Sequence, residues 1–261
     1  MIDRFVSACG ADDRIVAAFL HGSHARDAAD AFSDVDLAVV ATDAARDDVW
    51  GDRIELINRM GRPLFVEDFG SDVTCFFVLE DGTEGELSVG REGAFREIHA
   101  GPFRPLLDER GILADATFPP HEVDPAEQRE AVRRLLFWFW HELQHLTAAL
   151  GRGQLWWAMG QLESMRGMCV NLARATHGLP VEDEPYWKLD LEPAVEDLPA
   201  LRSTFVPMER EEMLRAAREI VTFFRERAPK VGRTLGVDYP GTLAGMLSDR
   251  FDALLGPDGQ R

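Results

Sequence analysis

The sequence predicts an α+β protein, with a mixed β-sheet and flanking helices in its first half and an α-helical bundle in its second half. Three observations lead to this prediction. Short apolar runs separated by glycine-containing turns fill residues 1–113, as strands and tight turns do. Beyond residue 125, apolar residues recur every three or four positions, as on amphipathic helices. The stretch 114–125 between the two patterns carries three prolines and no periodicity.

The first half alternates strand-like and helix-like segments. The run 14–21 is typical of a buried strand that turns into a helix at Gly22-Ser23, and 34–41 of a second strand. We expect an amphipathic helix around 48–60 and a strand over 65–69. Residues 74–90 form the clearest hairpin, because Asp81-Gly82 supplies a tight turn between two strand-like runs. A short helix over 91–101 and an extended segment over 103–108 follow.

The second half is predicted to be helical throughout. The expected helices cover about 126–151, 153–177, 192–203, 208–235 and 239–254, and glycine or proline separates them. Helices of this length and spacing favour a bundle. We therefore expect a first domain at 1–113, a linker at 114–125 and a helical domain at 126–261.

Composition limits the possible partners. The chain has 261 residues, is 46% hydrophobic and carries a formal net charge of −18. Its size and apolar content are sufficient for globular cores. Its negative charge opposes binding to nucleic acid or to an anionic membrane, and it attracts cationic small molecules. We expect no nucleic-acid partner and no membrane partner, and the sequence does not define an oligomeric state.

Targeting signals and cysteine motifs are not evident. Asp3 and Arg4 interrupt the beginning of the chain, where a signal peptide needs an apolar run, and the run LLFWFW is too short to span a bilayer. Cys9, Cys75 and Cys169 are widely separated and are expected to be buried free thiols. The protein is therefore expected to be soluble and cytoplasmic.

The main candidate for chemistry is a pair of carboxylates that follows a Gly-Ser turn. Residues two apart on a strand point to the same face, so Asp34 and Asp36 project together. Two close like charges favour a cation between them, and oxygen ligands suit Mg²⁺. The backbone N–H groups near Gly22 and Ser23 offer a seat for phosphate. This combination is typical of phosphoryl- or nucleotidyl-transfer sites.

Glu86 is the candidate for a third carboxylate. Such sites commonly use another acid, either as a metal ligand or to take a proton from the attacking hydroxyl. Glu86 lies on the return strand of the hairpin, and adjacent strands are about 5 Å apart or less. The alternative interpretation of Glu86 is an exposed strand residue without a catalytic role.

The segment GSHARDAADAFSDVDLAVV resembles the signature of the DNA polymerase β-type nucleotidyltransferase superfamily. The hairpin FFVLEDGTEGELSV and the following FREIHAGPFRPLLDERGIL are similar to the aminoglycoside 6-adenylyltransferase group of antibiotic nucleotidyltransferases. The resemblance continues through FWFW, LGRGQLWWA, PYWKLD and VGRTLGVDYP, and so covers most of the chain. It implies a nucleotidyltransferase catalytic domain at 1–113 and a helical substrate-binding domain at 126–261.

The resemblance also implies a reaction. Asp34 and Asp36 would hold Mg²⁺ against the triphosphate of ATP or another NTP, with Glu86 as third ligand or general base. Gly22 and Ser23 would bind the β- and γ-phosphates. A hydroxyl of the acceptor would attack the α-phosphorus, pyrophosphate would leave, and charge neutralisation by metal is the main electrostatic contribution to such transfers.

Two cations are candidates for the triphosphate. Lys188, in PYWKLD, matches a position in the similar proteins and is one of only two lysines, the other being Lys230. Arg26 follows the Ser23 turn and is the weaker candidate, since a surface arginine is the commoner outcome there. The sequence departs from the family pattern at His21, where an apolar residue is usual, and at position 86, where the group often has aspartate.

The acceptor is expected between the two domains, against carboxylates and aromatic residues of the bundle. The negative charge fits a cationic aminoglycoside antibiotic, which we prefer, whereas the aromatic helices fit a lincosamide. A set of six aromatic residues could stack on the base or on the acceptor, but most are more simply assigned to the core: Phe137, Trp138, Phe139, Trp140, Trp156 and Trp157.

Two further hypotheses concern the function: the first is another enzyme, and the second belongs to a different class. The protein could be a nucleotidyltransferase that modifies a protein in a toxin–antitoxin system. The ribonuclease component of one such system carries an Rx4-6H motif, and here Arg174 and His177 have the wrong spacing. It could also be a non-catalytic nucleotide-binding module, although the presence of all three acids argues against that.

A second motif, HELQH at 141–145, spells the zinc-peptidase signature HExxH. On a helix, His141 and His145 lie one turn apart, and Glu142 could polarise a bound water. The longer metzincin pattern fails, because Ala148 replaces a required glycine, and only the distant Glu163 remains as a third ligand. We interpret the motif as coincidental and place it in the wall of the interdomain cleft, where Glu142 would at most meet a cationic acceptor.

Overall fold

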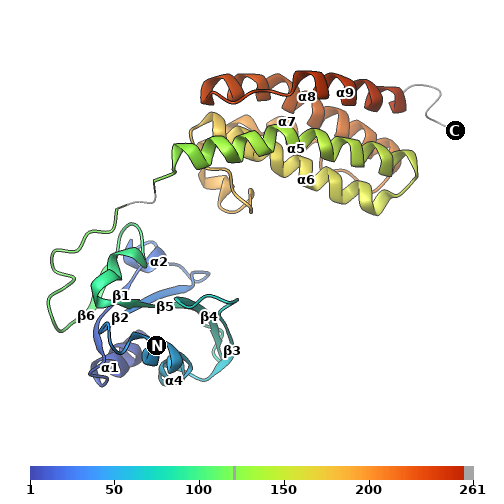
Figure 1. The fold of residues 1–261 in the computed structure, drawn as a ribbon. Coiled ribbons are helices and arrows are strands. Elements are labelled where there is room, and N and C mark those ends of the chain that lie inside the picture. The colour runs from blue at the N-terminus through green and yellow to red at the C-terminus, as the bar shows by residue number, and fades with distance from the viewer. Residues whose placement is uncertain (120–121, 256–261) are drawn as a thin grey trace. The chain divides into compact units, whose positions relative to one another are not determined.

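The computed structural model of the protein describes residues 1–119 and 122–255. The chain divides into two compact units, Met1–Glu122 and Val123–Arg261, and each is described by itself (Figure 1). The first unit contains the β-sheet, and the second is built from helices. The α+β class predicted from the sequence is therefore confirmed.

The first unit is organised around a six-stranded sheet of order β3-β4-β5-β2-β1-β6. Its strands are β1 Ile15–Leu20, β2 Val35–Ala41, β3 Pro63–Glu67, β4 Thr74–Leu79, β5 Glu84–Arg91 and β6 Arg104–Asp108. The sheet is mixed, because β2 and β5 pair in parallel while the other neighbours are antiparallel. The tight turn at Asp81-Gly82 joins β4 to β5, with Gly82 at φ 84°.

Helices cover both faces of this sheet. α1 (Ile2–Gly10) and α4 (Arg53–Met60) lie on one face, where Phe5 and Ile57 pack with Leu37 and Leu87 (Figure 1). The other face carries the short α2 (Gly22–Ala25) and the 3-10 helix η1 (Glu92–Glu97), together with the segment 112–118. All six residues of β1 are buried, as expected for a continuous apolar strand covered on both sides.

Three details of the first unit differ from the sequence prediction. Helix α1 was not predicted, because only three of its nine residues, Phe5, Ala8 and Cys9, are buried and the apolar pattern is correspondingly short. The helix expected at 48–60 is two helices, α3 (Arg46–Gly51) and α4, which separate at Asp52 directly after Gly51, a poor helix former. The helix expected at 91–101 is the shorter η1, and Ala94 inside it has a non-helical backbone.

Within its described residues, up to 255, the second unit has four long or medium helices and several short helical segments. The helices are α5 Pro125–Gly151, α6 Leu155–Thr176, α7 Pro199–Arg202, α8 Arg210–Leu235 and α9 Gly241–Leu255, with 3-10 turns η2 Leu189–Leu191 and η3 Pro193–Asp197. Helix α5 packs against α6, α8 and α9 and is thus central to the unit. The helix predicted at 192–203 is split into η3 and α7, each of which begins at a proline.

Helix α5 has a clear start in the sequence. The carboxylate of Asp124 accepts a hydrogen bond from the N–H of Ala126 at 2.7 Å, and Pro125 occupies the first helical position. Both features are typical of helix N-termini, because Pro lacks an N–H that would otherwise be unpaired. This cap falls within the stretch 114–125 that is predicted from the sequence to be a linker, of which residues 120 and 121 lie outside the described part of the chain.

The prediction that most of the six aromatic residues belong to the core is wrong. Phe139 and Trp140 are fully buried, and Phe139 stacks on Phe224 of α8. The other four are exposed by between 38% and 82%: Phe137, Trp138, Trp156 and Trp157. Successive helical residues are turned by about 100°, so four consecutive aromatic side chains cannot all face the same core.

The cysteine prediction is confirmed. Cys9, Cys75 and Cys169 are all buried free thiols. Burial is the largest cause that raises the pKa of Cys75, to about 11, and the thiol is therefore a poor nucleophile. Among the described helices, none combines the length and apolar character that crossing a bilayer requires.

Candidate active site

Two carboxylates face one another across neighbouring parallel strands. Asp36 of β2 and Glu86 of β5 are direct partners in the strand register. Their chain neighbours Leu37 and Leu87 are fully buried on the opposite face of the sheet. The alternation of a strand therefore sends the leucines into the core and leaves the acids half-buried on the face that carries α2.

Asp34 completes a group of three acids. It lies just before the first residue of β2 and is exposed. The pKa of Glu86 is raised mainly by burial, then by the negative charge of Asp36, and further by that of Asp34. The three acids predicted from the sequence are thus close enough for their charges to interact. Such a concentration of negative charge favours a bound cation.

Ser88 and Thr74 support Glu86 from the same face of the sheet. The hydroxyl of Ser88 donates to Glu86 Oε1 at 3.4 Å and opposes the rise of its pKa. Ser88 Oγ is in turn 2.8 Å from Thr74 Oγ1 on β4. Sequence reasoning missed this pair, although the alternation of the hairpin places both residues on the Glu86 face.

Gly22 brings the backbone of its turn directly against Asp36. Its φ is +60°, a left-handed conformation that favours glycine. A Cβ atom built at this position would lie only 1.7 Å from Asp36 Oδ2. The turn before α2 and the carboxylate of β2 are therefore in contact, and the absence of a side chain at position 22 makes that contact possible.

Ser23 presents a hydroxyl that nothing in the described chain satisfies. Its Oγ is buried and has no hydrogen-bond partner among the described residues. The preceding His21 anchors the turn to the strand, because its backbone N–H donates to the carbonyl of Asp36 at 3.1 Å. A buried orphan hydroxyl beside a carboxylate group fits a ligand that brings its own oxygen atoms.

The His21 ring is packed among aromatic side chains and a second histidine. Its ring lies 4.6 Å from that of His99, and Phe19 and Phe118 pack around the two. Burial, and then repulsion by His99, lowers the pKa of His21 to about 4. The imidazole is therefore neutral near pH 7, and it substitutes for the apolar residue that is usual before the Gly-Ser turn.

The two predicted cations are in different places. Arg26 follows α2 on the same turn as Ser23 and is exposed. Lys188 belongs to the helical unit, where its backbone has φ 53° and its Nζ lies 3.9 Å from the centroid of the Trp187 ring. The structure thus brings Gly22, Ser23 and the three acids together. Lys188 contacts Trp187 within the helical unit.

An aromatic pair lies beside Glu86 and was also missed from the sequence. Phe76 of β4 is the register partner of Glu86 and is 41% exposed. Its ring is 5.8 Å from that of Phe69, which is 74% exposed. Exposed aromatic rings on a sheet face next to a carboxylate group provide a stacking surface for a ligand.

The helical unit contains a separate cavity of about 490 Å³ between α5, α6 and the segment 181–186. Its lining includes apolar residues, Arg134, and a set of carboxylates and aromatic rings: Trp138, Glu163, Glu182, Asp183 and Tyr186. Glu163 pairs with Arg166, and Glu182 lies 3.4 Å from Arg174. A cavity with this lining suits a ligand that carries both hydroxyl and cationic groups.

The acids on neighbouring strands and the glycine turn against them fit an enzyme of the nucleotidyltransferase class. The sequence model of the streptomycin adenylyltransferase family matches residues 1–249, and the chain belongs to that family. It is therefore an adenylyltransferase of an antibiotic-resistance family. This confirms the resemblance to antibiotic nucleotidyltransferases found in the sequence.

Two solved structures are similar to the chain at low identity. One is an aminoglycoside 6-adenyltransferase from Bacillus subtilis, with 14% identity, a TM-score of 0.46 and coverage of 98% of this chain and 97% of that one. Another is a nucleotidyltransferase-like protein from Exiguobacterium sibiricum 255-15, with 14% identity, a TM-score of 0.40 and coverage of 88% and 75%. A comparison with curated proteins gives no match.

Proposed function

We propose that the protein transfers AMP from ATP to a hydroxyl group of a cationic aminoglycoside and releases pyrophosphate. The observation that carries this proposal is the Asp36–Glu86 register pair with the Gly22 turn held against Asp36. Membership of the streptomycin adenylyltransferase family supports the adenylyl donor and the antibiotic acceptor.

Asp34, Asp36 and Glu86 are the proposed ligands for Mg²⁺. Their oxygen atoms are the donors that Mg²⁺ prefers. Burial, and then the negative charges of Asp36 and Asp34, raise the pKa of Glu86, and a cation between the acids would offset that repulsion. When bound, Mg²⁺ neutralises the charge of the triphosphate and of the leaving pyrophosphate. The orphan Ser23 hydroxyl and the open backbone at Gly22 fit the triphosphate.

The order of strands gives the reaction a direction across the sheet. The turn of Gly22 and Ser23 follows β1 and lies on one side of Asp36, while β5 and β4 lie on the other side. In-line displacement places the attacking and leaving oxygens on opposite sides of the phosphorus. With the β- and γ-phosphates at the turn, the acceptor enters from the side of Glu86 and Phe76.

Glu86 is the proposed acceptor of the proton. It lies on the side of Asp36 from which the hydroxyl attacks, so its carboxylate is placed to take that proton. The bond from the acceptor oxygen to the α-phosphorus forms, the bond from that phosphorus to the bridging oxygen breaks, and the proton passes to the carboxylate. Arg26 and Lys188 are the proposed cations for the triphosphate.

The helical unit is proposed to recognise the acceptor through its 490 Å³ cavity. Asp183 supplies negative charge in the lining, where Glu163 and Glu182 pair with Arg166 and Arg174, while Tyr186 and Trp138 supply aromatic surface. The overall charge of −18 attracts a polycation. This overall charge, with Asp183 in the lining, favours an aminoglycoside over a lincosamide.

The test is a substrate screen with purified protein, ATP and Mg²⁺, read by pyrophosphate release and by mass spectrometry of the acceptor. Streptomycin and other aminoglycosides are expected to gain the mass of one AMP, and Asp36→Asn to abolish the gain. If only lincosamides gained this mass, the acceptor would be a lincosamide and not an aminoglycoside. If labelled ATP instead modified proteins in a lysate and no antibiotic were modified, the protein-modifying alternative would be favoured.

A further inference from the structure

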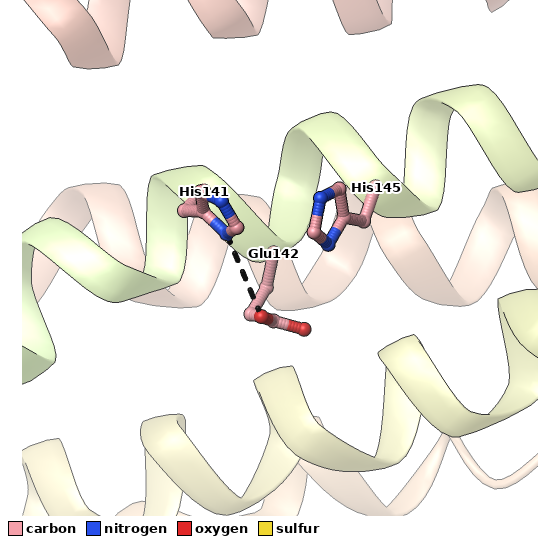
Figure 2. Close-up of side chains that lie close together, drawn as sticks. All are labelled: His141, Glu142 and His145. Carbon is pink, nitrogen blue, oxygen red and sulfur yellow. Dashed lines mark ion pairs between the residues drawn. The ribbon is translucent and has the colours of Figure 1, made fainter.

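The HELQH segment lies on α5 and brings three metal-binding groups together in the helical unit. Figure 2 shows the imidazoles of His141 and His145 one turn apart, with the carboxylate of Glu142 beside them. One ligand atom from each residue lies within 4.8 Å of the other two. His141 Nδ1 is 3.8 Å from Glu142 Oε1. The convergence of the two histidines follows from helical spacing, because residues four apart share a face.

Glu142 is the unusual member of the group. Its residue is only 7% exposed, yet its one polar partner within the described chain is His141, at ion-pair distance. No arginine or lysine of the described residues forms an ion pair with it. A buried carboxylate is costly unless a cation or hydrogen-bond donors compensate its charge. The surroundings of Glu142 therefore call for a positive charge at the position where the two imidazoles converge.

The imidazole rings are held in place by aromatic neighbours. The ring of Trp138 stacks on His141 at 4.6 Å with an interplanar angle of 20°. His145 lies edge-on to His141 at 4.3 Å, and Trp157 of α6 is 5.7 Å from His145. Trp138 and Trp157 thus flank the group on either side. This packing limits the freedom of the ligands before any ion binds.

We propose that His141, Glu142 and His145 bind one transition-metal ion of the Zn²⁺ class. Two imidazole nitrogens and one carboxylate form a set that Zn²⁺ accepts and that Mg²⁺ does not favour. In a tetrahedral site with bonds of about 2.0–2.1 Å, ligand atoms lie roughly 3.4 Å apart, so the present group closes by side-chain rotation. His141 is half-exposed, and its ring can make that adjustment by rotating within its stack on Trp138. Water completes the coordination.

The proposed site differs from the peptidase motif with the same letters. In that motif the glutamate activates water and a further protein ligand completes the metal site. Here the Glu142 carboxylate stands in the place of the third ligand, within the same 4.8 Å group. The proposed site therefore binds a metal ion across one turn of α5 and has no hydrolytic reaction.

Titration of the full-length protein with Zn²⁺ in excess Mg²⁺ tests the proposal. The background is Asp36→Asn, so that zinc binding at the sheet carboxylates does not contribute. We expect the parent protein to bind a single equivalent of zinc. In His141→Ala and in His145→Ala the zinc affinity should be lost or should fall by at least about 100-fold, because loss of a residue that only orients a ligand already lowers metal affinity by about 10- to 100-fold. Glu142→Gln keeps the shape of the side chain and is expected to weaken binding by about 10-fold or more.

His177→Ala is the matched control. His177 is a partly exposed histidine of the same unit, 2.7 Å from Asp197, and its removal is expected to leave the zinc equivalent in place. Cobalt substitution gives a second readout, because a tetrahedral site with nitrogen ligands produces a visible absorption band that the two histidine variants should lack. The site would be overturned if the parent protein bound no zinc equivalent. It would also be overturned if His141→Ala and His145→Ala bound zinc as tightly as the parent protein. Circular dichroism confirms that each variant is folded.

Discussion

Gly22 lies directly against the carboxylate of Asp36, so that a Cβ atom at position 22 would be 1.7 Å from Asp36 Oδ2. The relationship joins two parts of the proposed site that are distinct in the sequence, the turn after β1 and the start of β2. Asp36 lies on the largely buried strand β2, and Gly22 meets it with a left-handed backbone conformation.

Gly22→Ala is expected to reduce kcat/KM for adenylyl transfer by at least about 100-fold, because a displacement of roughly 1 Å at a reacting centre has that effect. Either the turn or Asp36 must move, and each is a proposed part of the site. Steady-state kinetics with ATP and streptomycin measure the loss. Gly10→Ala is the matched control, since a Cβ at Gly10 meets no atom within 4 Å. Normal kinetics in Gly22→Ala would show that the contact is unimportant.

Glu86→Gln is expected to lower kcat by about 10²- to 10⁴-fold, the range for loss of a general base. The same change should stabilise the metal-free protein, since it removes a charge that burial and Asp36 disfavour. Added Mg²⁺ should then raise the melting temperature of the wild type more than that of the variant. Thermal denaturation with and without Mg²⁺ separates these effects, and an equal response of both proteins to Mg²⁺ would argue against Glu86 as a ligand.

Much of the fold could be predicted from the sequence because its patterns are local. The alternation of polar and apolar residues in β2, and the Asp81-Gly82 turn of the hairpin, can each be recognised within a few residues of sequence. The pairing of β2 with β5 is different, since the strands are parallel and far apart in the chain. Sequence reasoning could propose Glu86 from its chemistry, but the register that places it opposite Asp36 depends on the whole sheet.

The missed features share a physical reason. Phe76 and Ser88 carry no motif of their own, and their importance comes from standing on the same face as Glu86. In the helical unit, the run FWFW looked uniformly apolar, yet the helix turns Phe139 and Trp140 inward and leaves Phe137 and Trp138 exposed. The face of a helix that becomes buried depends on its tertiary partners, which composition alone does not reveal.

His21 is expected to make the stability of the protein depend on pH. Its pKa falls from 6.5 to about 4 on folding, so the folded state binds fewer protons than the unfolded state. Its contribution is present above pH 6.5 and is lost as the pH falls through about 4. The free energy of unfolding of the wild type should therefore decrease over this interval more steeply than that of His21→Phe. Chemical denaturation at several pH values measures both slopes, and identical slopes would contradict the prediction.

Phe76→Ala is expected to raise the KM for the acceptor several-fold and to leave the KM for ATP nearly unchanged. The reason is the direction of the reaction across the sheet: the triphosphate lies at the Gly22 turn, and Phe76 lies beyond Glu86 on the far side. Loss of one aromatic stacking surface corresponds to about 0.5–1.5 kcal/mol, or roughly 2- to 13-fold. Leu64→Ala, an exposed apolar residue of the edge strand β3, is the control for a general effect of truncation. If Phe76→Ala raised only the KM for ATP, the nucleotide base would stack on Phe76. The acceptor would then bind on the opposite side of the site, which would contradict the prediction.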